Sequence, residues 1–128
     1  MASPFDWPQF LDVAAFCLDP KTACPSREAL DRTVVGRAYY AAYCTAAARV
    51  RDKGWFVPKG KPEDHGNVRM ELHGRGCIEV AKCLRTLSDW RHTCDYEKKD
   101  NTDFAGMASR AIQVARKAIN GLPSSARW

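Results

Sequence analysis

Apolar residues recur at helical spacing from Arg27 to Lys53, and this pattern constrains the fold more than any other feature of the chain. One apolar row contains Leu30, Val34, Ala38, Ala41, Thr45 and Ala48. The second row, which widens the face, contains Val35, Tyr39, Ala42 and Ala46. Ser26 is a favourable N-cap, and Gly54 is a favourable end for the helix. Because alanine is small, we expect other helices to approach this helix closely.

Four other segments share the helical periodicity, and no segment alternates strictly between apolar and polar residues as a strand would. The expected helices are Pro8–Leu18, Asp64–Leu72, Cys77–Tyr96 and Thr102–Asn120. Asp6 is the expected cap of the first helix, and Gly121 is the expected C-terminal cap of the last. Long helices with short connections pack most simply as antiparallel neighbours. The sequence therefore predicts an all-α fold, an antiparallel up-and-down helical bundle of four main helices plus a short extra helix.

The length of 128 residues is typical of a single domain. We expect one domain over residues 1–128, with an N-terminal helix and loop over 1–25 and a frayed tail over 122–128. No apolar run approaches the roughly 20 residues needed to cross a membrane. The N-terminus also lacks the pattern of a signal peptide. A soluble, cytoplasmic protein is therefore expected.

The chain has six cysteines, and no two of them have the C-x-x-C spacing of zinc or redox motifs. Cys44 and Cys94 lie on apolar helix faces, where a free thiol behaves as a small hydrophobe. Reduced thiols are expected, although a disulfide between Cys17 and Cys24 remains open. The histidines share no ligand spacing with the cysteines, so neither a metal site nor a cofactor is expected.

The net charge of +5 weakly favours an anionic partner, with nucleic acid as the first candidate. The mildly basic surface of an ordinary soluble protein explains this charge equally well. A basic segment with aromatic residues could guide RNA, although a solvated helix end and loop is the alternative. Its residues are Arg49, Arg51, Lys53, Lys59 and Lys61, beside Trp55 and Phe56.

Two polar segments interrupt the apolar faces: RAYYAAY at 37–43 and RHTCDY at 91–96. Arg91 stands in an otherwise apolar row, and Asp95 lies four residues later on the same face, so the two side chains can pair. A helix end that carries arginine, histidine, aspartate and tyrosine can hold a phosphate. The alternative is a hydrogen-bonded network that only fixes helix packing.

These two segments, together with DHGNV at 64–68, resemble the HEPN superfamily over roughly residues 27–120. The resemblance is closest to its small single-domain prokaryotic members. It implies a helical bundle that often forms homodimers and that often belongs to toxin–antitoxin, CRISPR or other phage-defence systems. Partners such as a nucleotidyltransferase are common in the family. Many members are metal-independent RNases with an R-x4-6-H motif.

The match to the RNase motif is incomplete. Arg91 corresponds to the motif arginine and His92 to the polar residue after it, but Tyr96 occupies the position of the strict motif histidine. A phenol is a poor base at neutral pH. A motif that begins at Arg85 ends at His92 with six residues between them. The candidate catalytic residues are therefore Arg85, Arg91, His92 and Tyr96, although a surface histidine is the alternative for His92.

The candidate binding residues flank the same two segments. They are Arg37, Tyr40, Asp95, Lys98 and Lys99. For Arg37 and Tyr40 the alternative is packing of the central helix.

Two functional hypotheses follow from the resemblance. The first is a non-catalytic HEPN-type module of a toxin–antitoxin or phage-defence system that binds RNA, a nucleotide or a partner protein such as a nucleotidyltransferase or protease. Tyr96, in place of the motif histidine, favours this hypothesis. The alternative is a metal-independent endoribonuclease that acts as a homodimer through Arg85 or Arg91 with His92.

Overall fold

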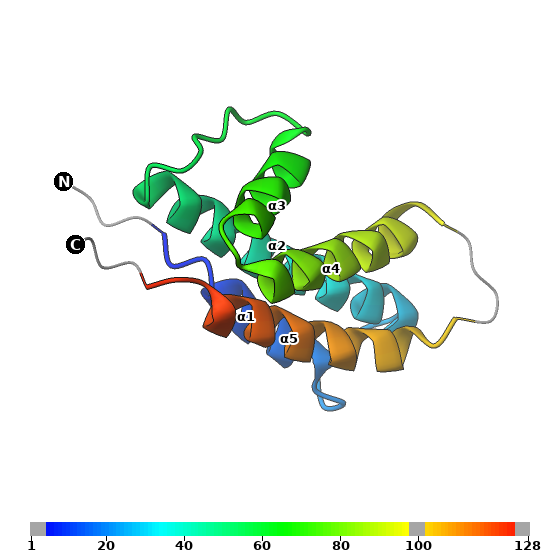
Figure 1. The fold of residues 1–128 in the computed structure, drawn as a ribbon. Coiled ribbons are helices and arrows are strands. Elements are labelled where there is room, and N and C mark those ends of the chain that lie inside the picture. The colour runs from blue at the N-terminus through cyan, green and yellow to red at the C-terminus, as the bar shows by residue number, and fades with distance from the viewer. Residues whose placement is uncertain (1–4, 98–101, 125–128) are drawn as a thin grey trace.

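The computed structural model describes residues 5–97 and 102–124, which form five helices and no strand. The helices are α1 (Gln9–Leu18), α2 (Arg27–Asp52), α3 (Asp64–Gly74), α4 (Ile78–Tyr96) and α5 (Phe104–Gly121). The four main helices α1, α2, α4 and α5 run in alternating directions along the bundle (Figure 1). The short helix α3 packs against α2 and α4. The expected all-α bundle is confirmed, with α3 as the extra helix.

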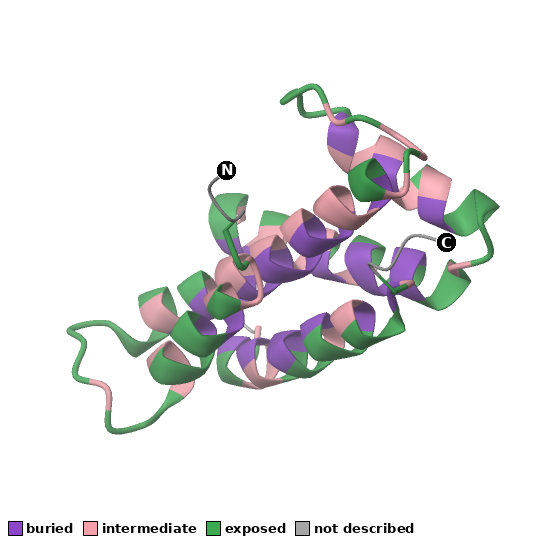
Figure 2. Ribbon diagram, turned by 90° about the vertical axis from the view of Figure 1, so that its left-hand side faces the viewer, coloured by how far each residue is buried: buried purple, intermediate pink, exposed green. Residues whose placement is uncertain are grey.

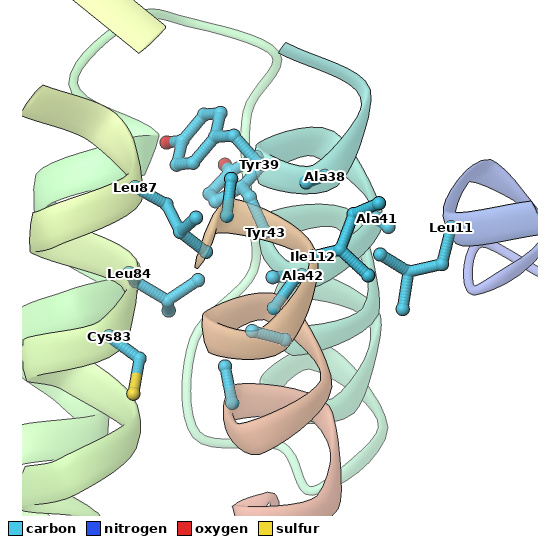
Figure 3. Close-up of a cluster of buried hydrophobic side chains, with 14 of the residues drawn as sticks. Leu11, Ala38, Tyr39, Ala41, Ala42, Tyr43, Cys83, Leu84, Leu87 and Ile112 are labelled. Atoms are coloured by element: carbon cyan, nitrogen blue, oxygen red, sulfur yellow. The ribbon is translucent and has the colours of Figure 1, made fainter. Parts of the chain in front are cut away.

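Helix α2 is the centre of the bundle, because it contacts every other helix. Its inward residues are buried along most of its length, whereas the loops and outer helix faces are exposed (Figure 2). Leu11 of α1 and Ile112 of α5 point toward Ala41 on one side of α2, and Leu84 and Leu87 project from α4 into the same core (Figure 3). The small alanine side chains of α2 therefore allow the other helices to approach it closely, as expected.

Two arginines near the start of α2 hold the C-terminal ends of other helices. Arg27 donates hydrogen bonds to the carbonyls of Cys17 and Leu18, at 2.9 and 3.0 Å, at the end of α1. Arg32 donates to the carbonyls of Cys94 and Glu97, both at 3.0 Å, at the end of α4. The last carbonyls of a helix have no partner within it, so cationic donors there satisfy them and complement the helix dipole. These contacts fix where α4 ends.

The structure confirms some of the expected helix ends and corrects others. The Ser26 hydroxyl accepts a hydrogen bond from the backbone N–H of Ala29 at 3.2 Å, as expected of an N-cap. Gly54 has a φ of 72° and follows α2 in a left-handed conformation. The side chain of Asp6 does not cap α1, which instead begins after Pro8. Gly121 is the last residue of α5 and is not its cap.

The tail differs from the frayed segment expected over 122–128. Leu122 is buried in the core, and the Arg49 side chain donates a hydrogen bond to the carbonyl of Pro123. Burial of an apolar side chain and a charged hydrogen bond both favour an ordered chain here. Residues 125–128 lie outside the described part of the structure.

All six cysteines have free thiols, so the alternative of a Cys17–Cys24 disulfide is not realised. Burial raises the pKa of the Cys94 thiol to about 11, which keeps it protonated as a small apolar group. Across the described ranges, every helix is too short or too polar to span a bilayer.

Candidate functional site

A cavity of about 650 Å³ opens between α2, α3 and α4. This volume is within the usual range for pockets that bind small molecules. Its lining contains three tyrosines, a histidine, two basic side chains and the loop before α3. The lining residues are Tyr40, Tyr43, Gly60, Lys61, Pro62, Asp64, His65, Ser88, Arg91 and Tyr96.

Stacked rings form one wall of the cavity. The imidazole of His65 lies parallel to the ring of Tyr43, with 3.9 Å between centroids and 9° between planes. Tyr39 and Tyr43 are four residues apart on α2, so they share a face, and their rings are stacked at 5.9 Å. The hydroxyl of Tyr39 and Nδ1 of His65 share a hydrogen bond. The start of α3 is thereby attached to the middle of α2.

Arg91 brings a positive charge to the aromatic wall. Its guanidinium lies 5.1 Å from the centroid of the Tyr40 ring and 5.8 Å from that of Tyr39, within the range of cation–π attraction. Its Nε donates to Oδ2 of Asp95 at 3.1 Å, which confirms the expected pair. The Arg91 side chain keeps 25% of its surface exposed. A bound anion can therefore reach a guanidinium whose orientation is already set.

Asp64 shapes the loop that closes the cavity. Its Oδ2 accepts hydrogen bonds from the backbone N–H groups of Lys59, Gly60 and Lys61, at 2.9, 2.7 and 3.0 Å. Burial raises the pKa of Asp64, but these three hydrogen bonds together outweigh burial and lower it. Gly60, with a φ of 77°, has the left-handed backbone that this tight loop requires. The loop places Lys61 at the cavity.

Burial and nearby positive charges control the protonation of His65. Burial, then Arg91 and Arg69, lower its pKa, and only Asp64 opposes them. Burial also raises the pKa of Tyr39 to about 12, against a hydrogen bond with Ser88. The imidazole and the phenol are therefore both neutral at physiological pH. A neutral imidazole can donate a proton at one nitrogen and accept one at the other.

The structure brings several of the predicted residues together. Arg91, Tyr96 and Tyr40 line the cavity, and Asp95 orients Arg91. Arg37 lies nearby, with its guanidinium 5.3 Å from the Tyr40 ring centroid and 5.2 Å from that of Phe10. Lys98 and Lys99 lie outside the described residues.

The predicted pairing of Arg85 with His92 is not formed around the cavity. Arg85 forms an exposed ion pair with Asp89 at 3.6 Å, and it lines a different groove between α3 and α4. His92 is exposed and is not among the residues that line the cavity, although its ring lies 5.1 Å from that of Tyr96, which is. At 3.6 residues per turn, neither Arg85 nor His92 lies on the face of α4 that carries Arg91. Their catalytic roles remain predictions without a shared pocket.

Some residues of the basic segment between Arg49 and Lys61 form contacts within the fold, and others are exposed to solvent. Trp55 and Phe56 pack against the core, and the Arg75 guanidinium lies 4.9 Å from the Trp55 ring centroid. Arg49 is engaged with the tail. Arg51 and Lys59 are exposed, whereas Lys61 faces the cavity. The role of these basic residues in guiding RNA stays a prediction.

Lys61 was expected only as part of the basic segment, and six other lining residues were not among the predicted site residues. These are Tyr43, Gly60, Pro62, Asp64, His65 and Ser88. For His65 a signal existed, because it belongs to the DHGNV segment that supports the resemblance. Its partner Tyr39 lies 26 residues earlier. Sequence spacing on one helix cannot reveal a contact between two helices.

Comparisons with known proteins identify no relative of this chain. No family model matches the sequence, and no curated protein or solved structure matches it. Among the described residues, no group of three or more histidine, cysteine, aspartate or glutamate side chains is arranged to hold a metal ion.

Proposed function

We propose that this protein is a HEPN-like module of a toxin–antitoxin or phage-defence system, and that it binds single-stranded RNA in the cavity between α2, α3 and α4. One observation carries the proposal. Arg91, Lys61 and His65 meet the rings of Tyr40 and Tyr43 in a single open cavity. Positive charge beside aromatic faces is the chemistry that binds unpaired nucleotides, since phosphates need cations and bases need rings.

The shape of the site favours single-stranded over double-stranded RNA. The positive and aromatic groups lie inside a cavity, so a nucleotide must leave a duplex to reach both. Arg91 offers a planar fork of donors that suits a phosphate oxygen pair. Exposed Tyr96, with 69% of its surface accessible, offers a ring at the rim for a second base. The net charge of +5 favours the approach of a polyanion.

Binding is tested by fluorescence anisotropy with a labelled single-stranded RNA at two salt concentrations. Arg91→Ala is expected to weaken affinity by about tenfold and to flatten the salt dependence, because one cationic contact is lost. Arg116→Ala, an exposed arginine on α5 at the other side of the bundle, is the matched control and is expected to bind as the wild type does. Equal affinities for wild type and Arg91→Ala would show that the RNA is not bound in this cavity.

The second candidate function is a metal-independent endoribonuclease. It is favoured by the presence of a histidine, an arginine and phenols in one cavity, which is the set of groups that general acid–base cleavage of RNA requires. A homodimer and a defence-system partner, such as a nucleotidyltransferase or protease, belong to the same proposal. Light scattering of the purified protein and a pull-down from its host test these two assemblies separately from RNA binding.

A further inference from the structure

The hydrogen bonds behind His65 decide which of its two ring nitrogens carries the proton. Nδ1 shares a hydrogen bond with the hydroxyl of Tyr39, which is also hydrogen-bonded to Ser88 of α4. The hydrogen bond from Ser88 acts to lower the pKa of Tyr39, so the serine hydroxyl donates and the phenol oxygen accepts. The proton of Tyr39 is then left for Nδ1, which accepts it with its lone pair. A neutral imidazole in this position therefore carries its own proton on Nε2.

The Nε2–H group of His65 is a donor that the fold leaves to a ligand. Nε2 has no hydrogen-bond partner among the described residues, and the side chain lines the cavity. The ring of Tyr43 covers one face of the imidazole, with 3.9 Å between centroids, and Tyr39 holds the opposite nitrogen. Because two contacts fix the ring, the direction of the free N–H is set before a ligand arrives.

The charges around this donor favour a negative ligand. Burial, then Arg91 and Arg69, lower the pKa of His65, and Asp64 opposes them with a smaller effect. The imidazole is therefore neutral, and positive charge outweighs negative charge at its ring. Asp64 is buried, and its Oδ2 already accepts hydrogen bonds from three backbone N–H groups. The carboxylate is thus largely compensated within the loop before α3.

Two cationic side chains complete a set of three donors. Lys61 comes from the loop before α3, His65 from α3 and Arg91 from α4, and all three line the cavity. Asp95 accepts a hydrogen bond from Nε of Arg91, which leaves the two terminal amino groups of the guanidinium for a ligand. Donors that come from three elements suit a group with three terminal oxygens. A phosphate at the end of a strand has three such oxygens, whereas a phosphate within the strand has two.

We propose that the cavity binds the terminal phosphate of a single-stranded RNA, held by His65 Nε2–H, Arg91 and Lys61. This inference rests on the proposed binding of RNA, and it names the part of the RNA that enters the cavity. A terminal phosphate carries a charge of about −1.5 to −2 at neutral pH, more than a phosphate within the strand, so it gains more from the positive surroundings. The adjoining bases then meet the rings of Tyr40 and Tyr96, which line the same cavity.

The first experiment compares strands that differ only at their ends. Single-stranded RNAs of one sequence carry a 5′-phosphate, a 3′-phosphate or hydroxyl groups at both ends, with a fluorescent base in the middle. Fluorescence anisotropy with the purified full-length protein measures their affinities. One phosphorylated strand is expected to bind about tenfold or more tightly than the hydroxyl strand, because charged hydrogen bonds are added. Equal affinity for all the strands overturns this inference and leaves the proposed binding of RNA in place.

The contribution of Lys61 is tested by Lys61→Met, which removes the ammonium group and keeps an unbranched side chain. The backbone N–H of residue 61 can still donate to Asp64, so the loop is expected to keep its shape. The preference for the phosphorylated strand is expected to fall several-fold, and the affinity for the hydroxyl strand should change less. Lys59→Met changes an exposed lysine of the same loop and is the matched control, with the full preference retained. An unchanged preference in Lys61→Met contradicts the assignment.

His65 is tested by a variant and by a measurement that needs none. His65→Phe keeps a ring beside Tyr43 and removes the N–H, so it should lose most of the preference, whereas His73→Phe, at an exposed position on the same helix, should keep it. In the wild type, a long-range ¹H–¹⁵N correlation spectrum reports which ring nitrogen carries the proton. The Nε2–H tautomer is expected. The Nδ1–H tautomer would remove the donor and overturn the inference, even where His65→Phe fails to fold.

Competition with adenosine 5′-monophosphate separates the end of an RNA from a free nucleotide. The nucleotide is expected to displace the phosphorylated strand only at a concentration at least about tenfold higher, because it lacks the further bases that stack on aromatic side chains. Equal affinity of the nucleotide and the phosphorylated strand would assign the cavity to free nucleotides and overturn RNA as its ligand. Absence of binding to every strand defeats the proposed function together with this inference.

Discussion

Helix α2 has two sides that differ in what they are made of and in what they do. Its alanine side, with Ala38, Ala41 and Ala42, packs against apolar side chains of α1 and α5 (Figure 3). Its tyrosine side, which we define by Tyr39, Tyr40 and Tyr43, faces α3, α4 and the cavity.

The difference shows how one helix can support both stability and a site. Small apolar side chains leave no polar group to satisfy, so the alanine side can close completely. A tyrosine has an apolar ring and a hydroxyl that needs a partner, so the tyrosine side gathers histidine, serine and arginine around it. The four predictions below test this separation, from the largest expected effect to the smallest.

The alanine side is tested by Ile112→Ala, which removes a buried side chain of α5 that points toward Ala41. The free energy of unfolding is expected to fall by about 2–5 kcal/mol, because apolar burial is lost and a cavity remains. Urea denaturation measures this change. RNA affinity of the folded variant should be unchanged. A loss of RNA affinity in the folded variant would show that the two sides of α2 are coupled.

The support of the tyrosine side is tested by Arg32→Ala. Arg32 donates to two carbonyls at the end of α4 and lies 4.1 Å from the ring centroid of Phe104. The free energy of unfolding is expected to fall by about 1.5–3 kcal/mol, because the lost hydrogen bonds have a charged donor. RNA affinity should fall as well, since Tyr96 is the last residue of α4. Arg27→Ala, which releases the end of α1 instead, should lower stability with no change in RNA affinity.

The pH dependence of stability reports on His65. Its pKa is lower in the folded protein than the ordinary value of about 6.5, so the unfolded chain binds a proton more readily. Stability is therefore constant above about pH 6.5 and falls as the pH drops from there toward the folded pKa, with a slope of at most about 1.4 kcal/mol per pH unit. Urea denaturation between about pH 5 and about pH 8 should show this slope in wild type but not in His65→Gln.

Asp64 acts in a separate and more acidic range. Its pKa is lowered in the folded protein, so its contribution is present above its ordinary value and is lost as the pH falls through the folded value. A slope in His65→Gln that matches wild type near pH 6 would mean that another group controls stability there.

The smallest effect on stability and RNA affinity is expected for Arg85→Ala, because Arg85 lies in the groove between α3 and α4 and contacts neither the alanine side nor the tyrosine side of α2. Arg85 and Asp89 form a pair in which both side chains are about two-thirds exposed, at 69% and 67%. Such pairs contribute about 1 kcal/mol at most and often nothing measurable. Thermal denaturation and RNA anisotropy should both match wild type. A clear loss of RNA affinity would extend the binding surface into the α3–α4 groove.

The helices could be predicted from the sequence because their evidence is local. Ser26 caps α2 and Gly54 follows it, as their side chains and backbone preferences indicate. Arg91 and Asp95 pair because four residues on a helix bring them to one face. The expected ends at Asp6 and Gly121 are wrong, since helix boundaries depend on the backbone around them as well as on the residue type.

The candidate site could be predicted only in part. Arg91, Tyr40 and Tyr96 belong to segments that were recognisable as unusual, and all three line the cavity. Tyr39 and His65 belong to segments that support the same resemblance, but nothing local shows that residues 26 positions apart on two helices are in contact. The pairing of Arg85 with His92 followed motif spacing, but Arg85 lines a separate groove and His92 is not among the residues that line the cavity.

Local patterns thus specified that the chain would be helical, which residues would be buried and where one ion pair would form, because each of these depends on spacing along a single helix. Which polar groups meet in one cavity depended on how α3 packs against α2 and α4. That packing joins an imidazole, a phenol and a guanidinium from three helices, and distances between helices are set by the whole core and not by any one segment.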